Sequence, residues 1–182
     1  MKKFLCILAV FVFFYFSYEL LLSLYALPSE KEKIVQTIES KTAKILKQRL
    51  GLIPFGVGGQ MMNQIQRLML DFQYKHEVTV EEGRRLLVYS VLQFLDEINS
   101  NEVIRKYLQN FPFQPKNVEV CIFLVKPDGS TDFDFGDLEV LVAKEGKIQF
   151  KYNNSTYSRY RTHEETFEEA CKILEEEKQK AM

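Results

Sequence analysis

The feature that most constrains this chain is an apolar block at its N-terminus. The block runs from residue 4 to residue 27, follows two lysines, and contains only three residues that are not apolar: Ser17, Glu19 and Ser23. A membrane-spanning helix needs about 20 apolar residues. A secretory signal peptide needs a basic start and an apolar stretch of about 7–15 residues. Residues 1–27 are therefore expected to be a signal-anchor or a signal peptide, and both are favoured over a buried core helix.

Two details favour the anchor over the cleaved signal peptide. A carboxylate near the bilayer centre costs roughly 2.5–3.5 kcal/mol, but Glu19 lies toward the far end of the block, where it can reach the interface. The segment Leu24-Tyr25-Ala26 is a poor cleavage site because Leu stands where a small residue is preferred. With the lysines inside, either alternative places the rest of the chain outside the cytoplasm.

The remaining residues, 28–182, have the composition of an ordinary folded domain. The whole chain carries 24 basic and 25 acidic residues, and 46% of it is hydrophobic, which excludes a disordered chain. The neutral balance argues against a general nucleic-acid binder. Three cysteines are too few for a disulfide scaffold.

Helical spacing dominates the first half of this body. A capping box at Ser29 and Glu32 begins an amphipathic helix that we expect to end near residue 50. The glycines and proline of residues 51–59 predict a hinge, and apolar residues at helical spacing predict a second helix over 61–72. A second capping box at Thr79 and Glu82 begins a central helix to residue 98, and a short helix is expected to end near residue 109.

The second half changes to a period of two. Alternation over 117–125, 138–142 and 148–152, with turns between, predicts a three-stranded antiparallel β-meander. Thr162 and Glu165 predict the cap of a C-terminal helix. The predicted fold class is α+β: an N-terminal hydrophobic helix, then helices packed on the meander, with a C-terminal helix. The domains are 1–27, the amphipathic helix and Gly-rich hinge of 28–60, and a single α+β domain of 61–182.

Side chains that carry chemistry are sparse. His76 and His163 have no second ligand at metal-binding spacing. The acidic loop 128–137 lacks the glycine and glutamate positions of a calcium loop. The glycines at 56–59 are not followed by the Lys-Ser or Lys-Thr of a phosphate loop. The sequence therefore predicts no catalytic residue, no cofactor and no metal site.

Two features remain as candidate sites. The Gly-rich segment is unusually apolar for a hinge, so it is a candidate for contact with a partner or a membrane through Leu52, Ile53, Phe55 and Val57. Cys121 falls on an apolar strand face and Cys171 on an apolar helix face. Outside the cytoplasm these two thiols are a candidate disulfide pair, and the alternative is two small buried apolar side chains.

Three stretches carry a resemblance to a known family: Phe55 to Met61, Glu81 to Val88, and Ile98 through Glu119. Over roughly residues 50–125 the chain resembles a family of small uncharacterised exported or membrane-anchored proteins of chlamydia-type intracellular bacteria. The resemblance transfers no functional residue. It implies a bacterial inner membrane protein with a periplasmic domain, or a protein exported after cleavage.

A folded body without a convergent polar cluster favours a binding or envelope-interaction domain. We expect residues 4–27 to hold this domain to the membrane. The expected partner is an envelope or host protein and not a nucleic acid. The alternatives are an extracytoplasmic hydrolase whose site forms only in the fold, and a secreted host-directed factor. Two buried ionisable groups within hydrogen-bond reach in one pocket would contradict the binding interpretation. An intact leader in purified membranes would exclude the secreted factor.

Overall fold

The computed structural model describes residues 28–154 and 161–180. Residues 34–182 form one compact unit. The predicted anchor or signal peptide, residues 1–27, lies outside the described residues. Among the residues that are described, no helix is long and apolar enough to span a bilayer.

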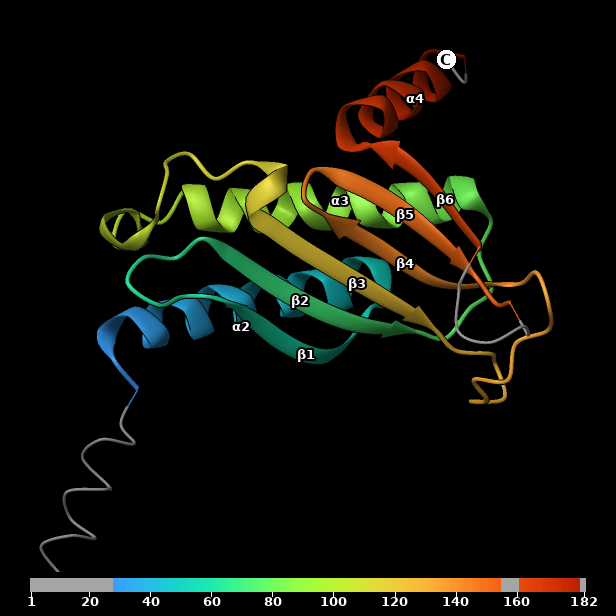
Figure 1. Cartoon of the computed structure of the whole chain (residues 1–182), viewed down its shortest axis with the longest axis horizontal. Helices are drawn as coiled ribbons and strands as arrows, with labels where there is room; N and C mark the ends of the chain where they lie inside the picture. The colour runs from blue at the N-terminus through green and yellow to red at the C-terminus, as the bar shows by residue number, and fades with distance from the viewer. Residues whose placement is uncertain (1–27, 155–160, 181–182) are drawn as a thin grey trace, which may run out of the picture. The chain divides into compact units, whose positions relative to one another are not determined.

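A six-stranded mixed sheet forms the body of the fold (Figure 1). The strands lie side by side in chain order: β1 (Ile53–Gln60), β2 (Arg67–Tyr74), β3 (Val118–Leu124), β4 (Leu138–Lys144), β5 (Lys147–Tyr152) and β6 (Arg161–Thr166). All neighbours are antiparallel except β2 and β3, which are parallel. A parallel pair needs a long crossover, and helix α3 (Val80–Asn99) lies in it.

Three α-helices pack on one face of this sheet: α2 (Glu30–Leu50), α3 and α4 (Phe167–Lys180). Two short 3₁₀ turns, η1 (Ile104–Tyr107) and η2 (Pro115–Asn117), lie between α3 and β3. Helix α2 runs antiparallel to α3, because Lys41 Nζ lies 2.7 Å from Glu97 Oε2 while Arg49 donates a hydrogen bond of 2.5 Å to the Tyr89 hydroxyl. The sheet and its helices therefore form two layers.

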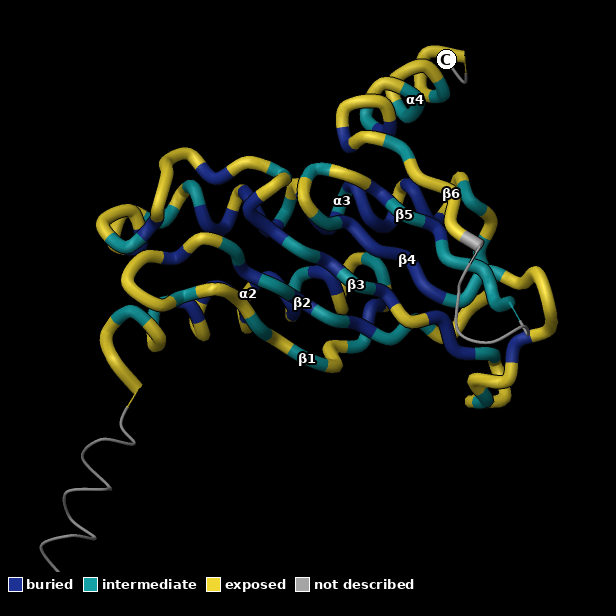
Figure 2. Tube along the Cα trace, viewed as in Figure 1, coloured by how far each residue is buried: buried dark blue, intermediate teal, exposed yellow. Residues whose placement is uncertain are grey.

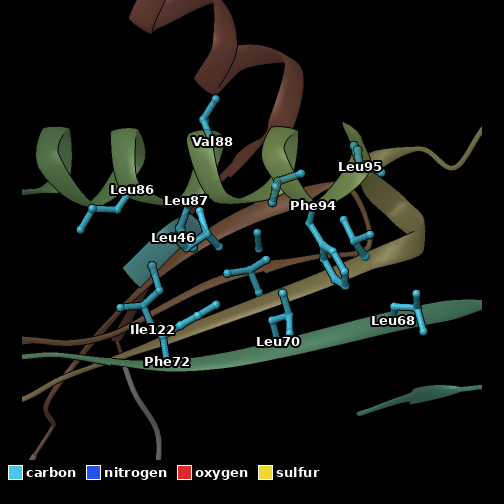
Figure 3. Packing of buried hydrophobic residues seen from close by; sticks show 14 of the residues in the cluster. Leu46, Leu68, Leu70, Phe72, Leu86, Leu87, Val88, Phe94, Leu95 and Ile122 are labelled. Atoms are coloured by element: carbon cyan, nitrogen blue, oxygen red, sulfur yellow. The ribbon is translucent and has the colours of Figure 1, made fainter. Parts of the chain in front are cut away.

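The hydrophobic core lies between these two layers (Figures 2 and 3). Alternate residues of the strands point into it, such as Leu70 and Phe72 of β2 and Ile122 of β3. They meet Leu46 of α2 and Phe94 of α3, both fully buried. The strand residues between them point to the opposite face, which no described helix covers.

The predicted α+β class is confirmed, and the predicted meander forms β3, β4 and β5. It is not a separate three-stranded sheet, however, since two strands precede it and one follows. The predicted hinge over 51–59 is strand β1, and the predicted helix over 61–72 is wrong, because Leu68, Leu70 and Phe72 alternate in β2. Those residues fit a period of two as well as the helical period, and pairing with β3 decides between them.

The predicted caps of α2 and α3 are confirmed. Thr79 and Glu82 form the capping box of α3, and Ser29 accepts from the backbone N–H of Glu32 at the start of α2. A further predicted cap, Asn99 with Glu102 for the short helix, is wrong, because the Asn99 side chain bonds to the backbone of Phe113. The predicted cap of the last helix is displaced by four residues. Residues 161–166 pair with β5 as strand β6, so α4 begins only at Phe167, next to the reciprocal hydrogen bonds of Thr166 with Glu169.

Candidate functional site

Strand β1 is one of the two edges of the sheet, and its sequence, Ile-Pro-Phe-Gly-Val-Gly-Gly-Gln, carries no charge. Its glycines allow close pairing with β2. At Gly59 a Cβ atom would lie 2.6 Å from the backbone oxygen of Arg67, a contact that only glycine avoids. The strand breaks its register once, between Pro54 and Gly56, where a bulge places Phe55.

The outer side of β1 has no backbone partner among the described residues. Apart from its ladder with β2, the strand makes one backbone hydrogen bond, from the N–H of Gln66 to the carbonyl of Gln60 in the following turn. An edge strand with free N–H and C=O groups is a template for another strand, and natural proteins blunt such edges with charge, proline or a bulge. Strand β1 has Pro54 and the bulge near its start, and its remaining length, residues 56–60, carries neither charge nor proline. The other edge, β6, carries charge-bearing side chains that include the exposed His163 and Glu164.

The structure divides the four predicted interaction residues between the surface and the core. Phe55 and Val57 are 65% and 62% exposed, Ile53 is half-buried, and Leu52 is fully buried. Phe55 packs edge-to-face on Phe123 of β3, with ring centroids 5.8 Å apart, on the face of the sheet that no described helix covers. Val57 faces the other way, toward α2.

A groove lies between α2 and β1 along this edge. It encloses about 420 Å³ and has Pro54 and Val57 of β1 as one wall. Helix α2 provides the other wall through Gln36, Glu39, Ser40, Ala43, Lys44 and Lys47. The two lysines are exposed and lie at the rim. A side chain held beside Val57 on this face of the sheet would therefore enter the groove.

Glu39 is the unusual member of the groove. It is only 4% exposed, yet the described residues provide it with no hydrogen bond and no ion pair. Burial raises the pKa of the Glu39 carboxyl to about 7. Every completely covered side-chain nitrogen or oxygen of the described chain has a partner, so the carboxylate oxygens of Glu39, which lines the groove, are not completely covered.

The other buried polar residues of the described chain are all satisfied. Glu97 pairs with Lys41, and Arg84 donates two hydrogen bonds to Glu165, at 2.7 and 3.1 Å. Thr42, Ser90 and Asn117 also have hydrogen-bond partners. A buried charged side chain is normally paired, and Glu39 is the exception. Glu39 lies on the buried stripe of α2, between Ile38 and Ala43. A carboxylate within such an apolar stripe was the signal that could have identified Glu39 from the sequence, and it was not recognised.

Arg84 and Glu165 are two buried ionisable groups within hydrogen-bond reach, which was the feature expected to favour an enzyme. Arg84 lines a cavity of about 690 Å³ together with His163, but Glu165 does not line it. The Arg84 donors Nε and Nη2 are both taken by Glu165, and His163 Nε2 lies 4.0 Å from the same carboxylate. The pair therefore fastens α3 to β6 and presents no nucleophile to the cavity.

The remaining candidates lie apart from β1 and from each other. The His76 ring contacts the Tyr74 ring at a tilt of 53° and lines a groove of about 790 Å³ beside α3 and α4. In the acidic loop, Asp128 accepts from the N–H of Ser130 as a turn residue. No group of three metal-ligating side chains gathers within the described ranges 28–154 and 161–180.

Cys121 and Cys171 are free thiols. Cys121 points to the uncovered face of the sheet, between the core residues Val120 and Ile122, whereas Cys171 of α4 packs against the core on the opposite face. Burial, followed by the neighbouring Asp71, raises the pKa of the Cys121 thiol to about 12. Burial raises that of Cys171 as well. Neither thiol is activated as a nucleophile.

No protein-family profile, curated protein or solved structure matches the chain.

Proposed function

We propose that the protein is an interaction domain that binds an extended segment of a partner protein along strand β1. The observation that carries this proposal is the uncharged, eight-residue edge, which has no backbone partner among residues 28–154 and 161–180 on its outer side. A partner strand added there extends the six-stranded sheet and uses the free N–H and C=O groups of β1. The exposed side chains of Phe55 and Val57 contact the added strand on its two faces.

The test is selection of peptides from a displayed library of random octapeptides by the full chain in mild detergent. We expect enrichment of peptides with alternating apolar residues, which bind in extended form. The double variant Phe55→Lys/Val57→Lys places charge on the edge and is expected to abolish the enrichment. Phe135→Lys, which changes an equally exposed phenylalanine in the β3–β4 loop, is the control and is expected to retain it.

Two results would overturn the proposal. One is that the unmodified chain enriches no peptide. The other is that sedimentation of the unmodified chain shows a dimer that the double variant abolishes, since the edge would then serve a second copy of the chain.

The proposed location is the outer side of a bacterial inner membrane, with residues 4–27 as the anchor. The support is the length of the apolar block and the two lysines before it. Cell fractionation followed by the mass of the mature N-terminus tests this proposal. An intact N-terminus in the membrane fraction is expected, and a mature chain that begins after residue 27 would contradict it.

A further inference from the structure

We propose that the groove between α2 and β1 is a specificity pocket for a lysine or arginine side chain of the bound segment, with Glu39 as the acceptor of its charge. This inference rests on the proposed function, because the basic side chain is delivered by a strand paired with β1.

The position of the groove fits such a side chain. Neighbouring strands lie about 4.8 Å apart, and residues directly opposite each other have Cβ atoms about 5 Å apart on the same face. A residue of the added strand opposite Val57 therefore has its side chain beside Val57, on the face that bears α2. Val57 and Pro54 form one wall of the groove there, so this side chain enters between β1 and α2.

The chemistry of the groove selects a cation. Glu39 lines it, almost completely buried and with no hydrogen bond or ion pair to a described residue, and its carboxylate oxygens are not completely covered. The hydrogen bonds that an ammonium or guanidinium group donates to a carboxylate are stronger than hydrogen bonds between neutral groups. The apolar stem of lysine or arginine also suits a wall of Pro54, Val57 and Ala43.

The charges around Glu39 act in both directions: the carboxylate attracts a cation, and the two exposed lysines at the rim oppose it, weakly because solvent screens them. Strand β1 carries no ionisable residue, and α2 contributes Lys44 and Lys47, which are exposed at the rim and form no ion pair with Glu39. An acidic side chain in the groove would face the Glu39 carboxylate and be repelled. An apolar side chain would cover that carboxylate without giving it a donor, which costs free energy.

The library selection described above tests the inference when it is repeated with Glu39→Gln. The unmodified chain is expected to enrich peptides with lysine or arginine at one fixed position. Glu39→Gln keeps the shape of the side chain and is expected to enrich extended peptides without that preference. Glu97→Gln, which changes a buried carboxylate outside the groove, is the matched control and is expected to keep the preference.

Fluorescence anisotropy with one selected lysine peptide and its norleucine analogue gives the size of the effect. We expect Glu39→Gln to weaken the lysine peptide roughly 10- to 100-fold and to leave the norleucine peptide nearly unchanged. From pH 6 to pH 8 the affinity of the unmodified chain for the lysine peptide is expected to rise about tenfold, because the ionised form of Glu39 binds the peptide.

The outcomes separate this inference from the function on which it rests. Peptides enriched without a basic position, or a basic preference that survives in Glu39→Gln, would overturn the specificity pocket and leave the β1 edge in place. The absence of any enriched peptide with the unmodified chain would overturn both.

Discussion

Replacement of Glu39 by glutamine is expected to stabilise the protein at neutral and alkaline pH. The carboxylate is buried without a donor, so its ionised form is disfavoured in the folded state and not in the unfolded state. Its pKa rises from 4.5 to about 7, and each pKa unit corresponds to about 1.4 kcal/mol. Because the Glu39 oxygens are not completely covered, we expect the substitution to raise the free energy of unfolding by somewhat less than the full shift, roughly 2–3 kcal/mol.

The sign of the pH dependence follows from the raised pKa. Below about pH 4.5 both states hold the proton, so the unmodified chain and Glu39→Gln have equal stability. Between about pH 4.5 and pH 7 the folded state keeps a proton that the unfolded state has lost, so the stability of the unmodified chain falls as the pH rises. Well above about pH 7 Glu39 is ionised in both states, so the difference in the free energy of unfolding between the unmodified chain and Glu39→Gln no longer changes with pH.

Urea unfolding followed by far-UV circular dichroism, from about pH 4.5 to about pH 8, measures this difference in the free energy of unfolding. Subtraction of the Glu39→Gln curve removes the contribution of every other titrating group. Glu97→Gln is the control, because its carboxylate pairs with Lys41 and its removal is not expected to raise stability. A constant difference between the unmodified chain and Glu39→Gln across this pH range would refute the reasoning that Glu39 is buried without a partner.

Three further predictions concern packing and reactivity. Arg84→Met leaves the buried Glu165 carboxylate unpaired and is expected to lower the free energy of unfolding in urea by about 3–5 kcal/mol, with partial recovery in the double variant Arg84→Met/Glu165→Leu. Gly59→Ala places a Cβ against the backbone oxygen of Arg67 and is expected to cost about 1–3 kcal/mol in the same assay. Cys121, with its pKa of about 12, is expected to stay unmodified by iodoacetamide at pH 8 in native protein and to react after unfolding, as read by mass spectrometry; rapid native labelling would contradict this.

Much of the helical layer could be predicted from the sequence because its signals are local. The capping residues of α3 lie three positions apart, and its apolar stripe repeats every turn, so neither depends on a distant partner. The alternation of β3, β4 and β5 is likewise visible within each segment.

The first two strands and β6 could not be predicted in the same way. Gly56, Gly58 and Gly59 have low strand propensity, and β1 forms because its glycines fit closely against β2. Strand β6 consists of polar residues that alternate in no hydrophobic pattern, and it is held by its pairing with β5 and by Glu165 on Arg84. Pairing between segments decided these elements. The sequence patterns therefore predicted a hinge at β1, a helix at β2 and the start of the C-terminal helix at β6.

Only part of the candidate site could be predicted from the sequence, again because some of its features depend on contacts between segments. The apolar character of Phe55 and Val57 is visible in the sequence, although the same pattern also included Leu52, which the fold buries. Glu39 was passed over because a glutamate in a helix is ordinarily solvated. Its burial depends on β1 lying beside α2, a contact that no sequence period reports.

Two unsatisfied features meet at the β1 edge, and this coincidence is the strongest argument that the edge is used. Within the part of the chain that the structure describes, the backbone groups on the outer side of β1 lack partners, and the buried carboxylate of Glu39 beside them accepts no hydrogen bond. The same protein blunts its other edge with charge and pairs its other buried carboxylates, Glu97 and Glu165. One added strand with a basic side chain would pair with the backbone of β1 and give the Glu39 carboxylate a donor at the same time.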